Sequence, residues 1–130
     1  MAIKRIGVLT SGGDAPGMNA AIRSIVRYTI YNKLEVIGVY RGYQGLINEE
    51  LKFLDHRSVS NIINRGGTIL KTARCPELLT EDGQKRAVQT LKNNNIDALV
   101  IIGGDGTHRG AYELFKKWKI PLVCIASTID

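Results

Sequence analysis

Short runs of apolar residues alternate along this chain with segments whose apolar residues recur at helical spacing. The apolar runs predict strands at residues 4–9, 35–40, 98–102 and 122–125, with a further short strand at 51–54. The helical spacing predicts helices at about 18–31 and 81–94, and another after residue 107 with Ala111, Leu114, Phe115 and Trp118 on one face. Because helices separate the strands, we expect an α/β fold with a parallel sheet and right-handed crossovers.

Polar residues and glycines predict where several of these elements begin or end. Thr80 precedes the second predicted helix as an N-cap, and Ser58 is expected to cap a short helix that runs through Asn64. Residues 41–45 contain two glycines and are interpreted as a turn. Cys124 lies within the last apolar run and is expected to be a small core residue.

The composition is that of an ordinary globular domain. The 130 residues are 44% hydrophobic and 23% charged, a size that allows one domain with its own core. The net charge of +6 favours anionic ligands, but the basic residues are dispersed and aromatic residues are only 6%, so small phosphorylated ligands fit better than nucleic acid. The longest apolar run, at 98–102, is far too short to span a membrane. The first residues lack a signal-peptide pattern, so the expected location is cytoplasmic.

Two glycine-rich loops carry the strongest functional signal. Ser11-Gly12-Gly13-Asp14-Ala15-Pro16-Gly17-Met18-Asn19 follows the first predicted strand, and Gly103-Gly104-Asp105-Gly106-Thr107 follows the strand at 98–102. Each loop precedes a predicted helix, so its glycines let the backbone approach a ligand that the unpaired helix N–H groups face. This geometry suits phosphate, and in a parallel sheet both loops lie at the carboxyl edge where ligands bind. Neither loop is a Walker A or a GxGxxG motif, and each alone also fits a plain turn.

Several other positions have two interpretations on residue chemistry alone. Asp105 offers the hard oxygen that Mg²⁺ binds, or it caps the following helix. Arg74 presents a fork of donors suited to phosphate, or it is a solvated surface residue. Tyr43 stacks on a base, or it packs against its own loop. Arg23 and Arg27 lie one helical turn apart and read as the solvated face of an amphipathic helix.

The histidines and the last residue give no independent signal for catalysis. His56 and His108 lack a third partner that would complete a metal site or a nucleophilic triad, and both are interpreted as surface residues. Asp130 is the last residue, and its chemistry alone does not separate a general base from a turn residue. The residue patterns therefore indicate a phosphate-binding α/β domain without fixing its reaction.

Several motifs occur together in an order that is typical of one enzyme family. The stretch Ile6-Gly7-Val8-Leu9-Thr10-Ser11-Gly12-Gly13-Asp14-Ala15-Pro16-Gly17-Met18-Asn19-Ala20-Ala21-Ile22-Arg23 is followed by Asn64-Arg65-Gly66-Gly67-Thr68, Thr72-Ala73-Arg74-Cys75-Pro76-Glu77 and Ile102-Gly103-Gly104-Asp105-Gly106-Thr107. This set resembles the bacterial ATP-dependent 6-phosphofructokinases, from Lys4 to Asp130 and over well under half of a full subunit. The resemblance implies that residues 1–130 form an ATP-binding domain, a Rossmann-like three-layer sandwich in the N-terminal part of a two-domain phosphofructokinase fold.

The resemblance implies transfer of the γ-phosphoryl group of MgATP to the 1-hydroxyl of fructose 6-phosphate in glycolysis. By motif, the implied ATP contacts are Gly13, Tyr43, Arg74, Cys75, Gly104, Asp105, Gly106 and Thr107, with Asp105 near Mg²⁺. Thr128, Ile129 and Asp130 match the substrate-binding segment, in which the threonine lies near the transferring group and the aspartate is the base for the sugar hydroxyl. Positioning and charge neutralisation are the main requirements of this chemistry.

The first predicted helix corresponds to an allosteric segment of the family. Arg23, Ser24, Ile25, Val26 and Arg27 match residues that bind ADP or phosphoenolpyruvate at a subunit interface of a homotetramer. Asn61 stands where the family usually has an acidic residue of the effector region. The effector region of this chain therefore departs from the usual residue pattern of the family.

The expected phosphoryl donor is ATP. Pyrophosphate-dependent members of the family tend to carry Asp at the position of Gly106 and Lys at the position of Ser127, and this chain has neither. Ser127 also differs from the glycine that is usual in ATP-dependent members. The alternatives are a pyrophosphate-dependent enzyme and a non-catalytic module that binds a nucleotide or effector; the stretch from Thr10 to Asn19 argues against an NAD or diacylglycerol kinase. We expect these 130 residues alone to have no kinase activity, because the implied base is the terminal residue.

Overall fold

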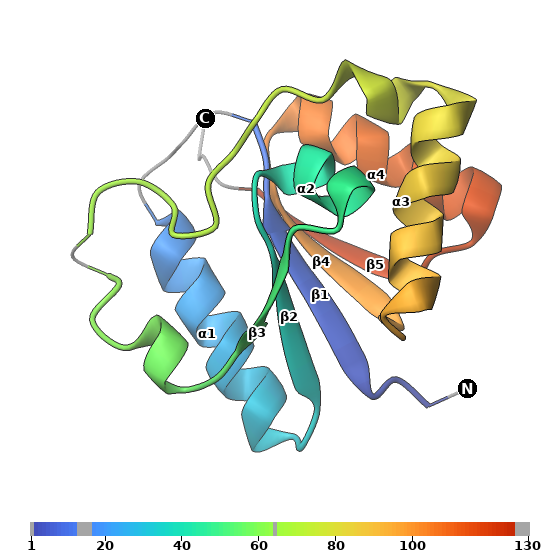
Figure 1. The fold of residues 1–130 in the computed structure, drawn as a ribbon. Coiled ribbons are helices and arrows are strands. Elements are labelled where there is room, and N and C mark those ends of the chain that lie inside the picture. The colour runs from blue at the N-terminus through green and yellow to red at the C-terminus, as the bar shows by residue number, and fades with distance from the viewer. Residues whose placement is uncertain (1, 13–16, 64, 127–130) are drawn as a thin grey trace.

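The computed structural model describes residues 2–12, 17–63 and 65–126, which form a five-stranded sheet between two layers of helices (Figure 1). The strands are β1 (Arg5–Thr10), β2 (Glu35–Val39), β3 (Leu51–Leu54), β4 (Ala98–Gly103) and β5 (Leu122–Ala126), in the order β3-β2-β1-β4-β5. The helices are α1 (Met18–Tyr31), α2 (Gly42–Asn48), α3 (Glu81–Asn93) and α4 (Asp105–Trp118), with 3₁₀ turns at Arg57–Val59 and Pro76–Leu79. The predicted three-layer α/β fold is confirmed. Among these described helices, none is long and apolar enough to cross a membrane.

Neighbouring residues of β1 send their side chains to opposite faces of the sheet. Val8 packs with Ile22 and Val26 beneath α1, whereas Leu9 packs against the layer that contains Leu114 of α4. All five side chains are fully buried. The two cores separate α1 from α2, α3 and α4, which cover the opposite face (Figure 1).

One strand departs from the expected parallel sheet. β1, β2, β4 and β5 are parallel, but β3 runs antiparallel to β2, with Val39 opposite Leu51. Residues 40–50 connect these two strands and contain only the short helix α2, which is less chain than a parallel crossover needs. The amide of Tyr40 donates to the carbonyl of Glu50 at 2.9 Å and turns the chain back. The sheet is therefore mixed and mostly parallel.

Residues 41–45, which are expected to form a turn, lead into α2 instead. Tyr43 and Leu46 are buried, and their packing stabilises the helix although it contains two glycines. Gly42 has a φ of +59°, and a Cβ at this position would lie 2.8 Å from the carbonyl oxygen of Thr10. Glycine is needed here because the helix backbone approaches β1 closely, so the glycine pattern of residues 41–45 misled the turn prediction.

The helix expected from Ser58 to Asn64 is wrong in its described part. Arg57–Val59 forms a 3₁₀ turn, and the Ser58 amide donates to Oδ1 of Asp55 at 2.9 Å. The Asp55 amide in turn donates to Oγ of Ser58 at 3.0 Å. This reciprocal exchange closes a local turn, so the Ser58 hydroxyl does not cap a helix. Asn64 lies outside the described residues.

One cap prediction is confirmed and two burial predictions are wrong. Oγ1 of Thr80 accepts from the amide of Gly83 at 3.0 Å and caps α3 as expected. Phe115 and Cys124 are exposed instead of buried. α4 buries Leu114 and turns Phe115 outward, while β5 is the last strand of the described sheet and has β4 as its neighbour on one side.

Asp97 fastens the start of β1 to the start of β4. Its Oδ2 accepts from the amides of Lys4 at 2.8 Å and Arg5 at 3.0 Å, and these bonds hold the pKa of the Asp97 carboxyl below its usual range. Replacing Asp97 with alanine is expected to lower the free energy of unfolding at pH 7 by about 1–3 kcal/mol, the usual contribution of such charged hydrogen bonds. Because the folded-state pKa is lowered, this stability is present above the unfolded pKa of about 3.9 and is lost as the pH falls through the folded value.

Urea unfolding of the unmodified and Asp97→Ala chains at pH 7 and at about pH 2.5 checks this prediction. The difference in free energy of unfolding between the two chains is expected to become smaller at acid pH. A difference that stays constant would contradict the role of the charged carboxylate. Asp82→Ala is the control, because Asp82 is exposed in the first turn of α3 and its loss is expected to cost less than about 1 kcal/mol.

Candidate functional site

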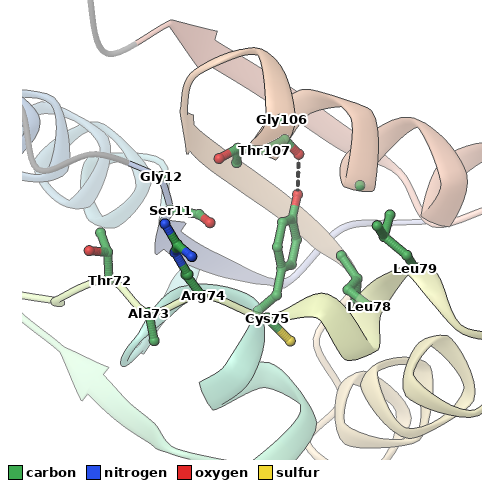
Figure 2. A pocket seen from close by; sticks show the side chains of 12 residues that line it. Ser11, Gly12, Thr72, Ala73, Arg74, Cys75, Leu78, Leu79, Gly106 and Thr107 are labelled. Atoms are coloured by element: carbon green, nitrogen blue, oxygen red, sulfur yellow. Dashed lines mark hydrogen bonds between the residues drawn. The ribbon is translucent and has the colours of Figure 1, made fainter.

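The carboxyl ends of β1 and β4 lie side by side and open into a pocket. Thr10 of β1 pairs with Ile102 of β4 near the ends of these strands. A cavity of about 520 Å³ lies at this edge of the sheet, and Figure 2 shows the side chains that line it. The lining comes from the loop after β1, the first turns of α4, Tyr43 of α2 and the segment from Thr72 to Leu79. Both glycine-rich loops therefore contribute to one site, as the sequence predicts.

The pocket has a polar end and an apolar end. Figure 2 shows Thr72 and Arg74 on the side of Ser11, while Leu78 and Leu79 lie on the opposite side. Arg74 is exposed and forms no ion pair within the described part of the chain, so its guanidinium is available to an anion. Leu79 is 69% exposed at the apolar end, where it offers a surface to a flat apolar group. The arrangement suits a ligand with a charged part and a less polar part.

The two glycine-rich loops pack directly against each other. A Cβ added to Gly103 would lie 2.7 Å from the carbonyl oxygen of Ser11 and 2.7 Å from Oγ1 of Thr107. Gly12 has a φ of +82°, and a Cβ there would lie 3.2 Å from the same Thr107 oxygen. Glycine at both positions lets the Thr107 side chain fit between the loops, so the loops form a continuous surface.

The N-terminus of α4 lies at this surface without a side-chain cap. Gly104 is the N-cap residue, its backbone is extended, and it supplies no side-chain hydrogen bond to the first turn. The first N–H groups of a helix have no partner within the helix, and the helix dipole makes this end positive. Gly106 and Thr107 of this first turn line the pocket. The site can therefore bind phosphate through backbone groups.

Tyr43 forms a buried support for the α4 loop. Its side chain is 4% exposed, and its hydroxyl donates to the carbonyl oxygen of Thr107 at 2.6 Å. Burial raises the pKa of Tyr43, so the hydroxyl stays protonated and remains a donor. A Cβ added to Gly110 would lie 3.2 Å from the Tyr43 ring, so the ring packs tightly against α4. Packing against the loop is thus the interpretation that the geometry favours, while contact with ATP stays a prediction.

A buried amide holds the segment that carries Arg74 in place. Nδ2 of Asn19 donates to the carbonyl oxygens of Ile62 at 3.1 Å and Gly67 at 2.6 Å, and Oδ1 accepts from the amide of Ile69 at 2.8 Å. Oγ1 of Thr10 adds a bond to the carbonyl oxygen of Lys71 at 3.0 Å. These bonds tie the chain after residue 61 to α1 and β1. They explain why two motifs far apart in the sequence meet at one pocket.

The structure places most of the implied ATP-binding residues around the pocket. Tyr43, Arg74, Cys75, Gly106 and Thr107 line it, Gly104 adjoins it as the N-cap, and Asp105 begins α4. Burial raises the pKa of the Cys75 thiol, which keeps it neutral against the pocket. Gly13, Thr128, Ile129 and Asp130 lie outside the described residues. Their roles remain predictions.

Sequence reasoning missed the apolar end of the pocket. Leu78 and Leu79 have no helical or strand periodicity around them, because they belong to the 3₁₀ turn Pro76–Leu79. Their proximity to Arg74 in the sequence is the signal that could have found them. A leucine pair that begins four residues beyond a phosphate-binding candidate is compatible with one ligand that spans both.

The implied effector residues lie on a different layer from the pocket. Ser24 and Arg27 are exposed on α1, and Arg23 is half-buried. Val26 is fully buried against the sheet and Ile25 is half-buried in the same core, so within this segment the polar side chains form the outer face. The structure brings none of these described side chains to the pocket, which α1 does not line.

Comparison with known proteins identifies the family. Residues 5–130 match the protein family described as Phosphofructokinase. The chain belongs to the phosphofructokinase family. Over 128 residues, or 98% of the chain, it is 56% identical to the ATP-dependent 6-phosphofructokinase of Halothermothrix orenii and 55% identical to ATP-dependent 6-phosphofructokinase 2 of Bacteroides thetaiotaomicron. The chain spans 39% of the length of each of these curated relatives.

Solved phosphofructokinases have the same fold. The structure of the Pichia pastoris enzyme in the T-state matches with a TM-score of 0.92 and 38% identity, over 100% of this chain and 16% of that one. A pyrophosphate-dependent phosphofructokinase from Marinobacter aquaeolei matches with a TM-score of 0.77 and 20% identity, over 95% of this chain and 33% of that one. The second match shows the fold alone, so it does not bear on the choice of donor.

Proposed function

We propose that this chain is the ATP-binding part of an ATP-dependent 6-phosphofructokinase, which transfers the γ-phosphoryl group of ATP to the 1-hydroxyl of fructose 6-phosphate. The observation that carries the proposal is the pocket at the ends of β1 and β4, where the two glycine-rich loops meet opposite Arg74. The names of relatives that are 52–56% identical support ATP as the donor. A cytoplasmic location and a role in glycolysis belong to the same proposal.

The polarity of the pocket supports one orientation of the nucleotide within this proposal. The triphosphate lies over Gly12, the first turn of α4 and Arg74, where backbone N–H groups and a guanidinium meet its charge. The base and ribose lie toward Leu78 and Leu79, which provide apolar area. Tyr43 holds the first turn of α4 in position through the hydrogen bond from its hydroxyl to the carbonyl oxygen of Thr107.

The residues at the start of α4 fit a Mg²⁺ ion that arrives with ATP. Mg²⁺ keeps several waters and takes one or two protein carboxylates together with phosphate oxygens. In the sequence Asp105 follows the N-cap Gly104 and precedes the pocket-lining Gly106, and we propose its carboxylate as the protein ligand. We propose that Asp105 would bind the ion together with the phosphate oxygens of the nucleotide. The ion supplies neutralisation of the phosphate charge.

The reacting end of the site belongs to residues 127–130. Ala126 pairs with Gly103 at the end of the β4–β5 ladder, so the chain leaves β5 beside the glycine-rich loop. From there we propose that Asp130 accepts the proton of the sugar hydroxyl and that Thr128 hydrogen-bonds the transferring group. Ile129 lies between them in the implied substrate-binding segment. Phosphoryl transfer needs positioning and charge stabilisation more than covalent chemistry, which agrees with this small set of groups.

The outer face of α1 is proposed to bind an anionic effector. Arg23 and Arg27 are one helical turn apart, and Ser24 lies between them on the side away from the sheet. ADP or phosphoenolpyruvate carries the charge that this pair can bind. The proposal includes a homotetramer, in which such a face would lie near a subunit interface.

ATP is expected to be the donor because Gly106 leaves space for a nucleotide. A Cβ at Gly106 would meet no atom within 4 Å, so an aspartate at this pocket-lining position would meet no steric obstacle and would add a negative charge at the pocket. Gly106→Asp is expected to lower kcat/KM for ATP by about tenfold or more, since like charges in contact cost several kcal/mol. The measurement uses a chimera in which this chain replaces the 128 matching residues of the Halothermothrix orenii enzyme, assayed with fructose 6-phosphate and either ATP or pyrophosphate.

Gly66→Asp is the matched control for this experiment. Gly66 also has open space around a Cβ, and it does not line the pocket, so the added charge is expected to leave kcat/KM for ATP within about twofold. Preference of the unmodified chimera for pyrophosphate would overturn the choice of donor. Absence of activity with both donors, in a folded chimera, would contradict the proposed function itself.

A further inference from the structure

His108 connects the first turn of α4 to the end of β5. Its Nε2 lies 3.3 Å from the carbonyl oxygen of Ile125, and its own amide donates to the carbonyl oxygen of Gly104 at 3.0 Å. A carbonyl oxygen only accepts, so the ring must carry a hydrogen on Nε2. His108 is half-buried, so the surface position expected from the sequence is only partly correct.

Thr107 and His108 extend this turn in two directions. The Thr107 side chain is 5% exposed and fits between Gly103 and Gly12, against the loop after β1. The next residue, His108, reaches β5 instead. The first turn of α4 therefore contacts the loop after β1 on one side and β5 on the other. The same turn lines the nucleotide pocket through Gly106 and Thr107.

The end of β5 has one strand neighbour within the described part of the chain, and Ile125 also packs against the core beneath α1. There β5 pairs with β4 alone, through Ile102 opposite Ile125 and Gly103 opposite Ala126. Residue 127 follows directly, and Thr128 and Asp130 come within four residues of Ala126. A hydrogen bond from α4 to Ile125 thus acts at the last described residues before the reacting segment.

We propose that His108 is a positioning residue for the proposed phosphoryl transfer, which fixes the end of β5 relative to the nucleotide loop. The inference rests on the proposed function, since it assumes that Asp130 is the base. His108 acts through Ile125 and does not contact the reacting atoms. Its loss therefore affects the alignment of the two substrates and leaves the nucleotide pocket intact.

The test compares His108→Asn with His108→Gln in the chimera. Both variants keep an amide nitrogen, but glutamine reaches about as far as Nε2 and asparagine stops one methylene short. His108→Asn is expected to lower kcat about 10- to 100-fold with KM for ATP within twofold, because a misplacement of about 1 Å costs up to about 10²-fold. His108→Gln is expected to keep kcat within threefold of the parent. Tyr112→Asn, an exposed change on the same helix, is the control and should leave both constants unchanged.

Three outcomes would overturn the inference. The first is a kcat of His108→Asn within twofold of the parent. The second is an equal loss of kcat in the glutamine and asparagine variants, which would mean that the length of the side chain carrying the hydrogen-bond donor does not matter. The third is a rise in KM for ATP that accounts for the loss, which would assign His108 to nucleotide binding. Asp130→Ser in the same background separates the two proposals: if it stays active, the proposed base is wrong, and if it is inactive while His108→Asn is active, only the positioning role fails.

Discussion

Replacing Asp130 with serine in the chimera is expected to lower kcat by about 10²- to 10⁴-fold, the usual contribution of a general base. Serine removes the carboxylate that accepts the proton of the sugar hydroxyl. KM for ATP is expected to change less than about threefold, because the pocket that binds the nucleotide is built from β1, α2, α4 and the segment from Thr72 to Leu79. Steady-state kinetics with ATP and fructose 6-phosphate give both constants.

Asp82→Ser is the matched control for the Asp130 prediction. It makes the same chemical change at an exposed position in the first turn of α3, away from the residues that line the pocket. Its kcat is expected to equal that of the parent within about twofold. Turnover of Asp130→Ser within about threefold of the parent would show that another group accepts the proton.

Replacing Gly45 with alanine is expected to lower the free energy of unfolding of the 130-residue chain by about 3 kcal/mol or more. A Cβ at Gly45 would overlap the carbonyl oxygen of Tyr40, which is backbone and cannot rotate away. Relief of the overlap requires α2 to move, and Tyr43 on α2 would then lose its bond to Thr107. Urea unfolding and calorimetric titration with MgATP are therefore expected to show lower stability and weaker binding together.

Gly66→Ala is the control for Gly45→Ala. No atom lies within 4 Å of a Cβ at Gly66, and its backbone is not left-handed, so its free energy of unfolding is expected to change by less than about 0.5 kcal/mol. A Gly45→Ala chain as stable as this control would mean that α2 adjusts without strain. A destabilised chain with unchanged ATP affinity would instead show that the position of Tyr43 does not determine the shape of the pocket.

The meeting of the two glycine-rich loops at one edge of the sheet could be predicted from the sequence because its signals are local. The glycines at 12, 103, 104 and 106 follow apolar runs directly, and the structure places both loops at the same sheet edge. Arg74 and Cys75 came from the family resemblance and also line the pocket. The apolar end formed by Leu78 and Leu79 was missed, because a 3₁₀ turn has no longer periodicity that a sequence pattern can reveal.

Short-range patterns failed where a residue's role depends on what packs against it. Residues 41–45 have the composition of a turn, but burial of Tyr43 and Leu46 makes them part of α2. His108 gave no signal, because its partner is a carbonyl oxygen 17 residues away on β5. Cys124 lies in an apolar run typical of a core strand, yet β5 is the last strand of the described sheet.

The sequence by itself determined the alternation of strands and helices, the cap at Thr80 and the two glycine-rich loops, since each depends on residues within one or two turns of chain. Only the tertiary structure decided that β3 runs antiparallel to β2. It also decided that Tyr43 supports Thr107 across 64 residues of sequence. Such contacts are set by which surfaces exclude water from each other, and that depends on the whole sheet and its helices at once.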